Sequence, residues 1–282
     1  MELDKILYEI TLNSIYLGNF LIFSLLVFYI LKFLLNLKRS NEKLIGSLVI
    51  FSLSIAVSSL YSGESYGLIN DLIYIWAYSI LSFFLLLVGH YINDFLLFHK
   101  VKNIKEISEG NLSILIVEGA HFLAIGTILN SVINNFFNIN ENQIKIFIYI
   151  TFIFTFIQFL LILGIIIYRW LLLKLTNLDL INLIYKNNIS AGVLLFSNYT
   201  VISFLLASAF APEKDLLTTL VYSLFYFVFS IFIILVFKII IDLVLIPDDN
   251  IKSILENDRY KKAIFIELIT LSMIFIYHFL SS

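Results

Sequence analysis

Residues 146–163 read IFIYITFIFTFIQFLLIL, a stretch without a single charged side chain. As a helix rising 1.5 Å per residue it is about 27 Å long, close to the roughly 30 Å thickness of a bilayer's hydrocarbon core. Comparable apolar stretches recur along the chain. A buried helix of a soluble protein would explain one such segment but not several, so the sequence predicts an integral membrane protein.

The composition agrees with this assignment and excludes several kinds of chemistry. Of 282 residues, 61% are hydrophobic and 13% charged, and the mean hydropathy of +0.99 is far above that of a soluble domain. The net charge of −2 gives no reason to expect nucleic-acid binding, and the absence of cysteine excludes disulfides and thiolate sites. The acidic start, MELDKILYEI, lacks the basic flank of a signal peptide, so we expect the first apolar segment to be retained.

Eight apolar segments are long enough to be spanning helices. Both prolines, Pro212 and Pro247, fall at segment ends, where a missing backbone N–H does least damage. The fold class that we expect is therefore an all-α integral membrane protein with eight transmembrane helices. The expected spans are 12–36, 44–61, 72–98, 112–134, 145–172, 189–210, 217–246 and 263–280.

The basic residues in the connections predict an orientation. Lys and Arg favour the cytoplasmic side, and fourteen lie in the first, third, fifth and seventh connections against three on the other side. We therefore expect a multi-pass protein of the bacterial inner membrane with both termini outside the cytoplasm. The fourteen are Lys32, Lys38, Arg39, Lys43, Lys100, Lys102, Lys105, Arg169, Lys174, Lys186, Lys252, Arg259, Lys261 and Lys262.

Internal repetition divides the chain into units of about 70 residues, each a long helix, a basic linker and a shorter helix. FLIFSLLVFY at 20–29 resembles FLLILGIIIY at 159–168, and Asp94 and Asp242 recur at an offset of 148 residues. Glu118 and Glu267 recur at an offset of 149. The larger repeat is four helices, so we expect two membrane domains, 1–137 and 138–282. The shorter helices carry the small residues and are expected in the centre, with Phe-rich long helices such as 146–163 facing lipid.

The linker at 175–188, LTNLDLINLIYKNN, leaves two interpretations open. Its apolar residues suit a helix lying in the membrane interface. They equally suit an extension of the fifth span into a polar helix.

One segment is similar to a known protein family. Residues 91–130, YINDFLLFHKVKNIKEISEGNLSILIVEGAHFLAIGTILN, resemble the YjfL-like inner-membrane proteins, a domain of unknown function. The features that carry the resemblance are Asp94 at the end of a long helix, the linker ending Glu109-Gly110-Asn111, and the pair Glu118-Gly119. Residues 242–268 match more weakly. The resemblance implies a tandem duplication of a four-helix unit and supplies no activity.

Polar residues inside the spans are the candidate site. Counted from the helix ends, Asp94 and Glu118 lie about 9–10 Å deep, and His90 and His121 about 15 Å. On two antiparallel helices these depths predict a carboxylate pair with a histidine pair one turn deeper. In the second copy Asp242 and Glu267 repeat the carboxylate layer, while Lys238 replaces His90 and Thr270 replaces His121.

Three interpretations of these residues stay open. They form a cation or proton site, they bond across helices and fix the packing, or the aspartates reach the interface and the glutamates are satisfied locally. Glu-x-x-His also occurs at di-iron sites of helical bundles, but it occurs once here, so we assign no metal and no cofactor.

The leading functional hypothesis is a protein that binds or moves a small cation or proton. The alternative is a non-catalytic scaffold that docks a cytosolic partner through Lys100, Lys102 and Lys105. We do not expect an enzyme. The bilayer is the expected partner, a second copy of the chain and a cytosolic protein are left open, and no nucleic acid is expected.

The charge asymmetry makes a direct prediction about topology. A reporter fused after Ser282 should be active if it requires the extracytoplasmic side, because the eighth span would return the chain there. The measurement is a pair of fusions, one to an enzyme that works only outside the cytoplasm and one to an enzyme that works only inside. Activity of the cytoplasmic fusion alone would overturn the orientation.

Overall fold

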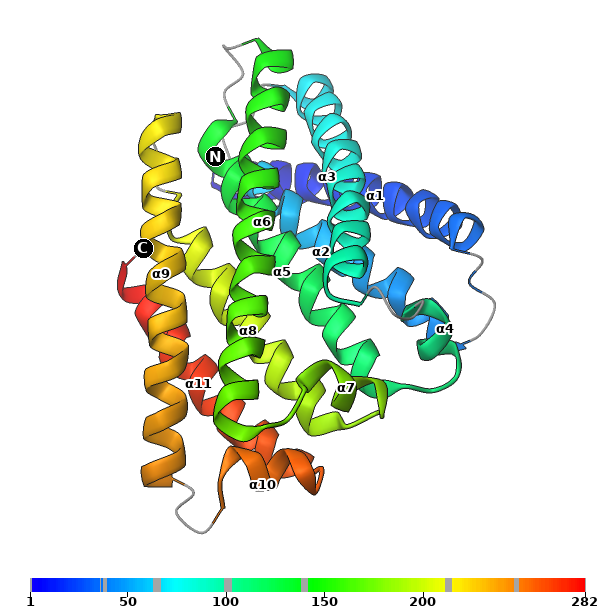
Figure 1. Cartoon of the computed structure of the whole chain (residues 1–282). Helices are drawn as coiled ribbons and strands as arrows, with labels where there is room; N and C mark the ends of the chain where they lie inside the picture. The colour runs from blue at the N-terminus through cyan, green and yellow to red at the C-terminus, as the bar shows by residue number, and fades with distance from the viewer. Residues whose placement is uncertain are drawn as a thin grey trace.

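A computed structural model describes residues 2–35, 37, 40–62, 67–98, 103–137, 142–210, 215–245 and 249–281. All regular structure in these residues is helical (Figure 1). The elements are α1 (Glu2–Leu34), α2 (Ser40–Ser62), α3 (Leu68–Leu96), α4 (Asn103–Ser108), α5 (Leu112–Phe136), α6 (Gln143–Thr176), α7 (Leu180–Tyr185), α8 (Ile189–Ala207), α9 (Leu216–Ile240), the π-helical turn η1 (Ile241–Leu245), α10 (Ile251–Glu256) and α11 (Tyr260–Ser281).

Seven helices of the described residues are long and apolar enough to cross a membrane, namely α1, α2, α3, α5, α6, α8 and α9 together with its π turn. They coincide with the first seven expected spans. The eighth, 263–280, falls within α11, which is a 22-residue helix but is not among the seven. The molecule is thus an all-helical chain with the character of a multi-pass membrane protein, and the count of eight stays a prediction.

Polar residues set where the helices after the linkers begin. The side chain of Asn111 accepts a hydrogen bond from the backbone N–H of Ile114, and Asn188 accepts from Ala191 in the same way. Such caps satisfy N–H groups that a helix cannot pair internally, which matters most where little water is present. The linker Asn residues therefore fix the first turns of α5 and α8.

The helices form two layers. The helices α2, α5, α8 and α11 pack side by side in a row, with the most extensive contacts between α5 and α8 and between α2 and α5. The long helices α1, α3, α6 and α9 pack against this row, and in Figure 1 α3, α6 and α9 run across its face. In α5 and α8, 72% of the spanning residues are buried, against 17% in α1.

This arrangement corrects one expectation about α6. The shorter helices α5 and α8 are central, as expected, but the Phe-rich segment 146–163 does not simply face lipid. More than half of the α6 span is buried, including Ile157, Leu161 and Ile165. The reason is that α6 contacts α5, α8, α3 and α9, so one side of it lies inside the bundle.

Close backbone approach holds the central row together. A Cβ on Gly126 would lie 2.6 Å from the carbonyl oxygen of Ser52 on α2, and a Cβ on Gly192 would lie 3.0 Å from that of Ser113 on α5. Without a hydrophobic driving force in lipid, helices associate mainly through such packing of small residues. The glycines therefore set the distance between α2, α5 and α8.

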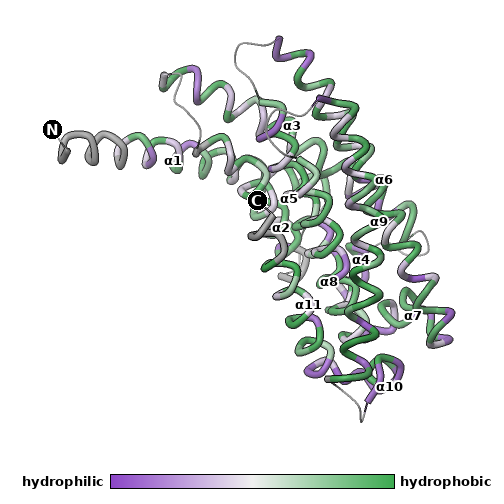
Figure 2. Tube along the Cα trace, turned by 90° about the vertical axis from the view of Figure 1, so that its left-hand side faces the viewer, coloured by the Kyte–Doolittle hydropathy of each residue, from purple (hydrophilic) through white to green (hydrophobic). Residues whose placement is uncertain are grey.

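The outer surface is strongly apolar, as a lipid-facing surface should be. Phe33, Phe95 and Leu175 are among the most exposed side chains. In Figure 2 the long helices are mostly hydrophobic, while hydrophilic positions gather near the linker helices α7 and α10. One side of α9 exposes a continuous series of large apolar residues: Leu217, Val221, Phe225, Val228 and Phe232.

The last three of the four basic linkers each contain a short helix: α4 between α3 and α5, α7 between α6 and α8, and α10 between η1 and α11. The apolar side chains Leu180, Ile181 and Ile184 of α7 are buried in the protein. The linker at 175–188 is therefore neither an extension of the fifth span nor a helix that presents this face to the membrane interface.

The same pair of hydrogen bonds joins successive linkers. Asn111 Nδ2 donates to the carbonyl of Ile184 in α7, and Asn188 Nδ2 donates to that of Leu255 in α10. Beside them, the backbone N–H of Ser113 donates to Asn187 and that of Ser190 donates to Asp258. These two acceptors both have a left-handed backbone, with φ of 58° and 45°.

The glycine contacts predict how the row responds to a single added methyl group. Gly126→Ala should lower the stability of the protein by about 1–3 kcal/mol, because the new Cβ meets the backbone of Ser52. Gly18→Ala is the matched control, since nothing lies within 4 Å of its Cβ. On the exposed α1 it should be neutral or stabilising by about 0.5–1 kcal/mol. Melting in detergent compares the two, and equal melting temperatures would contradict the role of Gly126.

Candidate functional site

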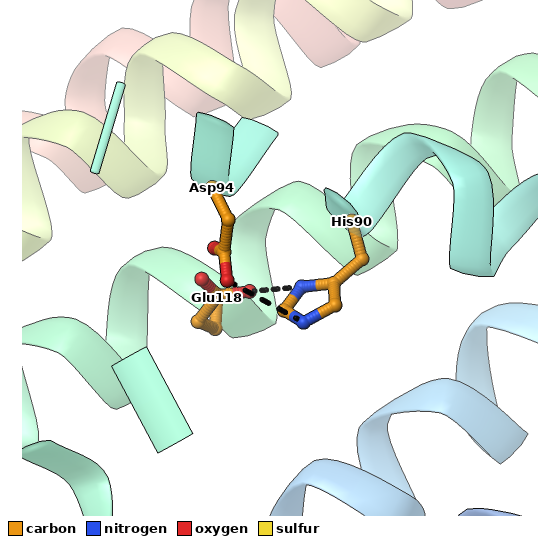
Figure 3. Close-up of side chains that lie close together, drawn as sticks. All are labelled: His90, Asp94 and Glu118. Carbon is orange, nitrogen blue, oxygen red and sulfur yellow. Dashed lines mark hydrogen bonds and ion pairs between the residues drawn. The ribbon is translucent and has the colours of Figure 1, made fainter. Parts of the chain in front are cut away.

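A buried cluster of polar side chains lies where the end of α3 meets the start of α5. His90 and Asp94 come from α3, one helical turn apart, and Glu118 comes from the second turn of α5. In Figure 3 the three side chains point toward one another. The expected carboxylate pair is therefore present.

His90 connects the two carboxylates. Its Nδ1 lies 3.2 Å from Oε2 of Glu118 and its Nε2 lies 3.7 Å from Oδ2 of Asp94 (Figure 3). The ring stacks on Phe122, with the ring centroids 5.4 Å apart and an interplanar angle of 26°. Both ring nitrogens thus face a carboxylate oxygen, and the imidazole plane is fixed by an aromatic neighbour.

Asn103, the first residue of α4, completes the cluster. Its Nδ2 donates to Oδ1 of Asp94 at 2.6 Å and to Oε1 of Glu118 at 2.5 Å. The side chain is buried although it belongs to a linker. Sequence reasoning missed Asn103, because an Asn in a charged linker looks like a surface residue. The available signal was its position in the short linker between the two acids, nine residues after Asp94.

Exposure changes across the cluster. Glu118 is 1% exposed and His90 is 2% exposed, whereas 27% of the Asp94 side chain is accessible. Asp94 is thus the most accessible of the three side chains. A buried carboxylate is costly without partners, so the histidine, the amide or a bound cation must compensate its charge.

The predicted histidine pair is wrong. His90 binds the carboxylates, whereas His121 faces α6 and α8: the amide of Gln158 donates to its Nε2 at 2.9 Å, and its ring lies 5.4 Å from that of Tyr199. Tyr199 in turn donates to Oδ1 of Asn93 at 2.5 Å. The three-residue step from Glu118 to His121 turns the side chain toward different neighbours, which depth alone does not reveal.

The second copy differs in its contacts. Lys238 and Glu267 form a buried ion pair, while Oδ1 of Asp242 accepts a hydrogen bond from the backbone N–H of Ile251 at 2.9 Å. The expected Asp242–Glu267 carboxylate layer is therefore replaced, because the lysine supplies a counter-charge within the membrane span. Beside it lies a cavity of about 330 Å³ lined by Tyr168, Lys238, Asp242 and others. Thr270 bonds to its own helix, at the carbonyl of Ile266.

Several of the basic linker residues have acidic neighbours. Lys105 is exposed and lies 3.7 Å from Glu109. Lys262 and Arg259 pair with Asp249, and the hydrogen bond from Lys262 contributes most to lowering the pKa of that carboxyl. Lys100 and Lys102, named with Lys105 as a docking surface, lie outside the described residues.

The donor set can hold a proton or a metal ion. One ligand atom each from His90, Asp94 and Glu118 lies within 4.8 Å of the others, which is the grouping a metal requires. The second copy offers an ammonium group at the equivalent place, and an ammonium group has no lone pair for a metal. The sequence analysis placed Lys238 at the position of His90 but did not predict its ion pair with Glu267.

The ion pair of the second copy makes a testable prediction about stability. Lys238→Met should destabilise the protein by about 3–5 kcal/mol, because it leaves Glu267 buried without a counter-charge. The double variant Lys238→Met, Glu267→Met should recover most of that loss. Detergent unfolding of both single variants and the double variant gives the coupling, and additive effects would show that the pair is not an energetic unit.

The comparisons with known proteins concern the family. No curated protein and no solved structure matches the chain. Two successive segments, residues 67–167 and 144–279, match the family model described as Domain of Unknown Function (DUF350). The double match confirms the expected resemblance to a family of unknown function and is consistent with its occurrence in tandem, while the boundaries 1–137 and 138–282 stay a prediction. Because the matches cover most of the chain, the protein belongs to the DUF350 family.

Proposed function

We propose that the protein binds or moves a small cation or a proton through the cluster of His90, Asp94, Asn103 and Glu118. The observation that carries the proposal is Glu118, a carboxylate 1% exposed on a spanning helix, in contact with a histidine and an amide. Ionisable groups inside membrane spans are costly and are retained mainly where they serve transport or binding.

The proposed architecture is a bacterial inner-membrane protein of eight spans with both termini outside. Its support is the seven long apolar helices, the helical α11 packed along α8, and the basic linkers. The repeated hydrogen bonds from Asn111 to α7 and from Asn188 to α10 support the smaller repeat of about 70 residues. In this orientation the cluster lies in the cytoplasmic half of the membrane.

Further polar residues continue from the cluster into the bundle. Asn93, Tyr199, His121 and Gln158 are all buried and come from α3, α8, α5 and α6. They touch in sequence, from the Asn93–Tyr199 hydrogen bond through the two rings to the His121–Gln158 hydrogen bond. Such a series offers polar groups to an ion or a proton beyond Glu118, whereas helix packing alone needs no such continuity.

The alternative, a scaffold that docks a cytosolic partner through Lys100, Lys102 and Lys105, has less support. The one lysine of the three that the structure describes, Lys105, lies near Glu109 on the surface. A surface ion pair of this kind contributes little and leaves Lys105 accessible, so the alternative is kept as an outcome of the test.

The central test of the proposal is Glu118→Gln. This variant removes the buried charge at almost constant volume, so cation or proton flux into proteoliposomes should fall to the level of protein-free vesicles. Glu109→Gln is the matched control, because it removes an exposed carboxylate from the adjoining linker and should leave flux unchanged. Fluorescent dyes inside the vesicles report protons and metal ions separately.

Unchanged flux in a folded Glu118→Gln variant would overturn the proposal. Replacing Lys100, Lys102 and Lys105 together with neutral residues tests the scaffold alternative separately from the ion site. If these substitutions abolish capture of a specific cytosolic protein while Glu118→Gln does not, the scaffold function is favoured.

A further inference from the structure

We infer that the ion taken by the cluster is a divalent transition-metal cation, with His90, Asp94 and Glu118 as ligands and Asn103 as a fourth. This inference rests on the proposed function and names the chemical class of its substrate. Four independent features of the described residues lead to it: the spacing of the donors, their net charge, the state of the Asn103 amide and the contrast with the second copy.

The spacing of the donors is close to that of a coordination shell. A metal with ligands at about 2.1 Å places its tetrahedral donors roughly 3.4 Å apart. The donor atoms of His90, Asp94 and Glu118 lie within 4.8 Å of one another, and Nδ1 of His90 is already 3.2 Å from Oε2 of Glu118. Side-chain rotations that draw these donors closer together would complete the shell.

The charge of the site selects a divalent ion. Asp94 and Glu118 together supply two negative charges, and a neutral imidazole and an amide add none. A divalent cation balances this charge, whereas a monovalent ion leaves one negative charge uncompensated in a site where Glu118 is almost inaccessible to water.

The amide of Asn103 supplies an observation independent of the acids. Its nitrogen donates to both carboxylates, but its Oδ1 is buried and has no hydrogen-bond partner among the described residues. Buried polar atoms are normally satisfied, so this oxygen calls for an explanation. A half-turn of the amide about its last side-chain bond gives the oxygen to a cation held between Asp94 and Glu118 and moves the nitrogen to the position that the oxygen occupies here.

The type of donor favours transition metals over magnesium and calcium. Imidazole suits Zn²⁺, Fe²⁺, Ni²⁺ and Cu²⁺, while Mg²⁺ and Ca²⁺ prefer oxygen donors and water. The stacking of His90 on Phe122 holds the ring at the carboxylates. The His90 ring is thus a preorganised nitrogen ligand that a magnesium site would not need.

The second copy has other residues at the positions equivalent to His90 and Asn103. Lys238 occupies the place of His90 and neutralises Glu267, and Ile251 occupies the place of Asn103. The ammonium group takes the role of the cation at Oε1 of Glu267, and it has no lone pair to offer a metal. We therefore expect one metal ion per chain rather than two.

The test uses the full chain purified in detergent, stripped of metal and titrated with Mn²⁺ while the free ion is followed by electron paramagnetic resonance. One Mn²⁺ should bind per chain, an equal concentration of Zn²⁺ should displace it, and Mg²⁺ at that concentration should not. Glu118→Gln and Asn103→Leu should each weaken Mn²⁺ binding at least tenfold, whereas Asn103→Asp, which keeps an oxygen ligand, should retain it.

Glu256→Gln is the control, because it removes an exposed carboxylate from α10, in the linker of the second copy, and should leave Mn²⁺ binding unchanged. Circular dichroism and gel filtration show which variants fold. The Asn103→Asp protein keeps the test decisive if Asn103→Leu does not fold.

Equal displacement by Mg²⁺, two ions per chain, or tight binding by a folded Asn103→Leu protein would each overturn the metal assignment. Another outcome is that neither Mn²⁺ nor Zn²⁺ binds at millimolar concentration, while Glu118→Gln abolishes a proton or sodium flux. That outcome overturns the metal assignment and leaves the proposed function standing. Flux insensitive to Glu118→Gln overturns the proposed function instead.

Discussion

A carboxylate buried on a membrane helix must find its counter-charge and hydrogen bonds within the protein, because the bilayer core supplies neither. Glu118 satisfies this constraint by drawing partners from two other elements, His90 on α3 and Asn103 on α4. These contacts fix the end of α3, the linker helix and the start of α5 relative to one another. The close packing of Gly126 on Ser52 then holds α5 against α2, so the site is built on a rigid pair of helices.

The two copies solve the same constraint in different ways. In the second copy Lys238 approaches Glu267 directly, and the aspartate at the helix end bonds to the linker backbone instead of to a side chain. In this ion pair the lysine compensates the charge of Glu267 through Oε1, and an ammonium group cannot serve as a metal ligand. The first copy has a weaker internal donor, an imidazole, together with an amide that satisfies the acids through only one of its two polar atoms. The two copies therefore compensate an equivalent buried glutamate with different partners, an ammonium group in one and an imidazole with an amide in the other.

Much of the fold follows from hydropathy, because bilayer thickness dictates helix length and the apolar segments coincide with the long helices. The helix rise also placed Asp94 and Glu118 at one depth, and they do meet. Depth does not determine direction around the helix axis, which is why His121 was assigned to a histidine pair but contacts Gln158. Asn103 was missed for a related reason: hydropathy carries no information about which linker residues fold back into the protein.

Asn103 ties the linker helix α4 to the two carboxylates. Within the described cluster it is the one residue that does not lie on a spanning helix, and it touches both carboxylates. The partly exposed Asp94 lies on the same side. The helix α4 also packs against α2 and α5, so it is seated on the central row that the backbone approach at Gly126 and Gly192 holds together. Under the proposed function, the spanning helices α3 and α5 would supply the histidine and the two carboxylates, and this linker helix would supply the amide.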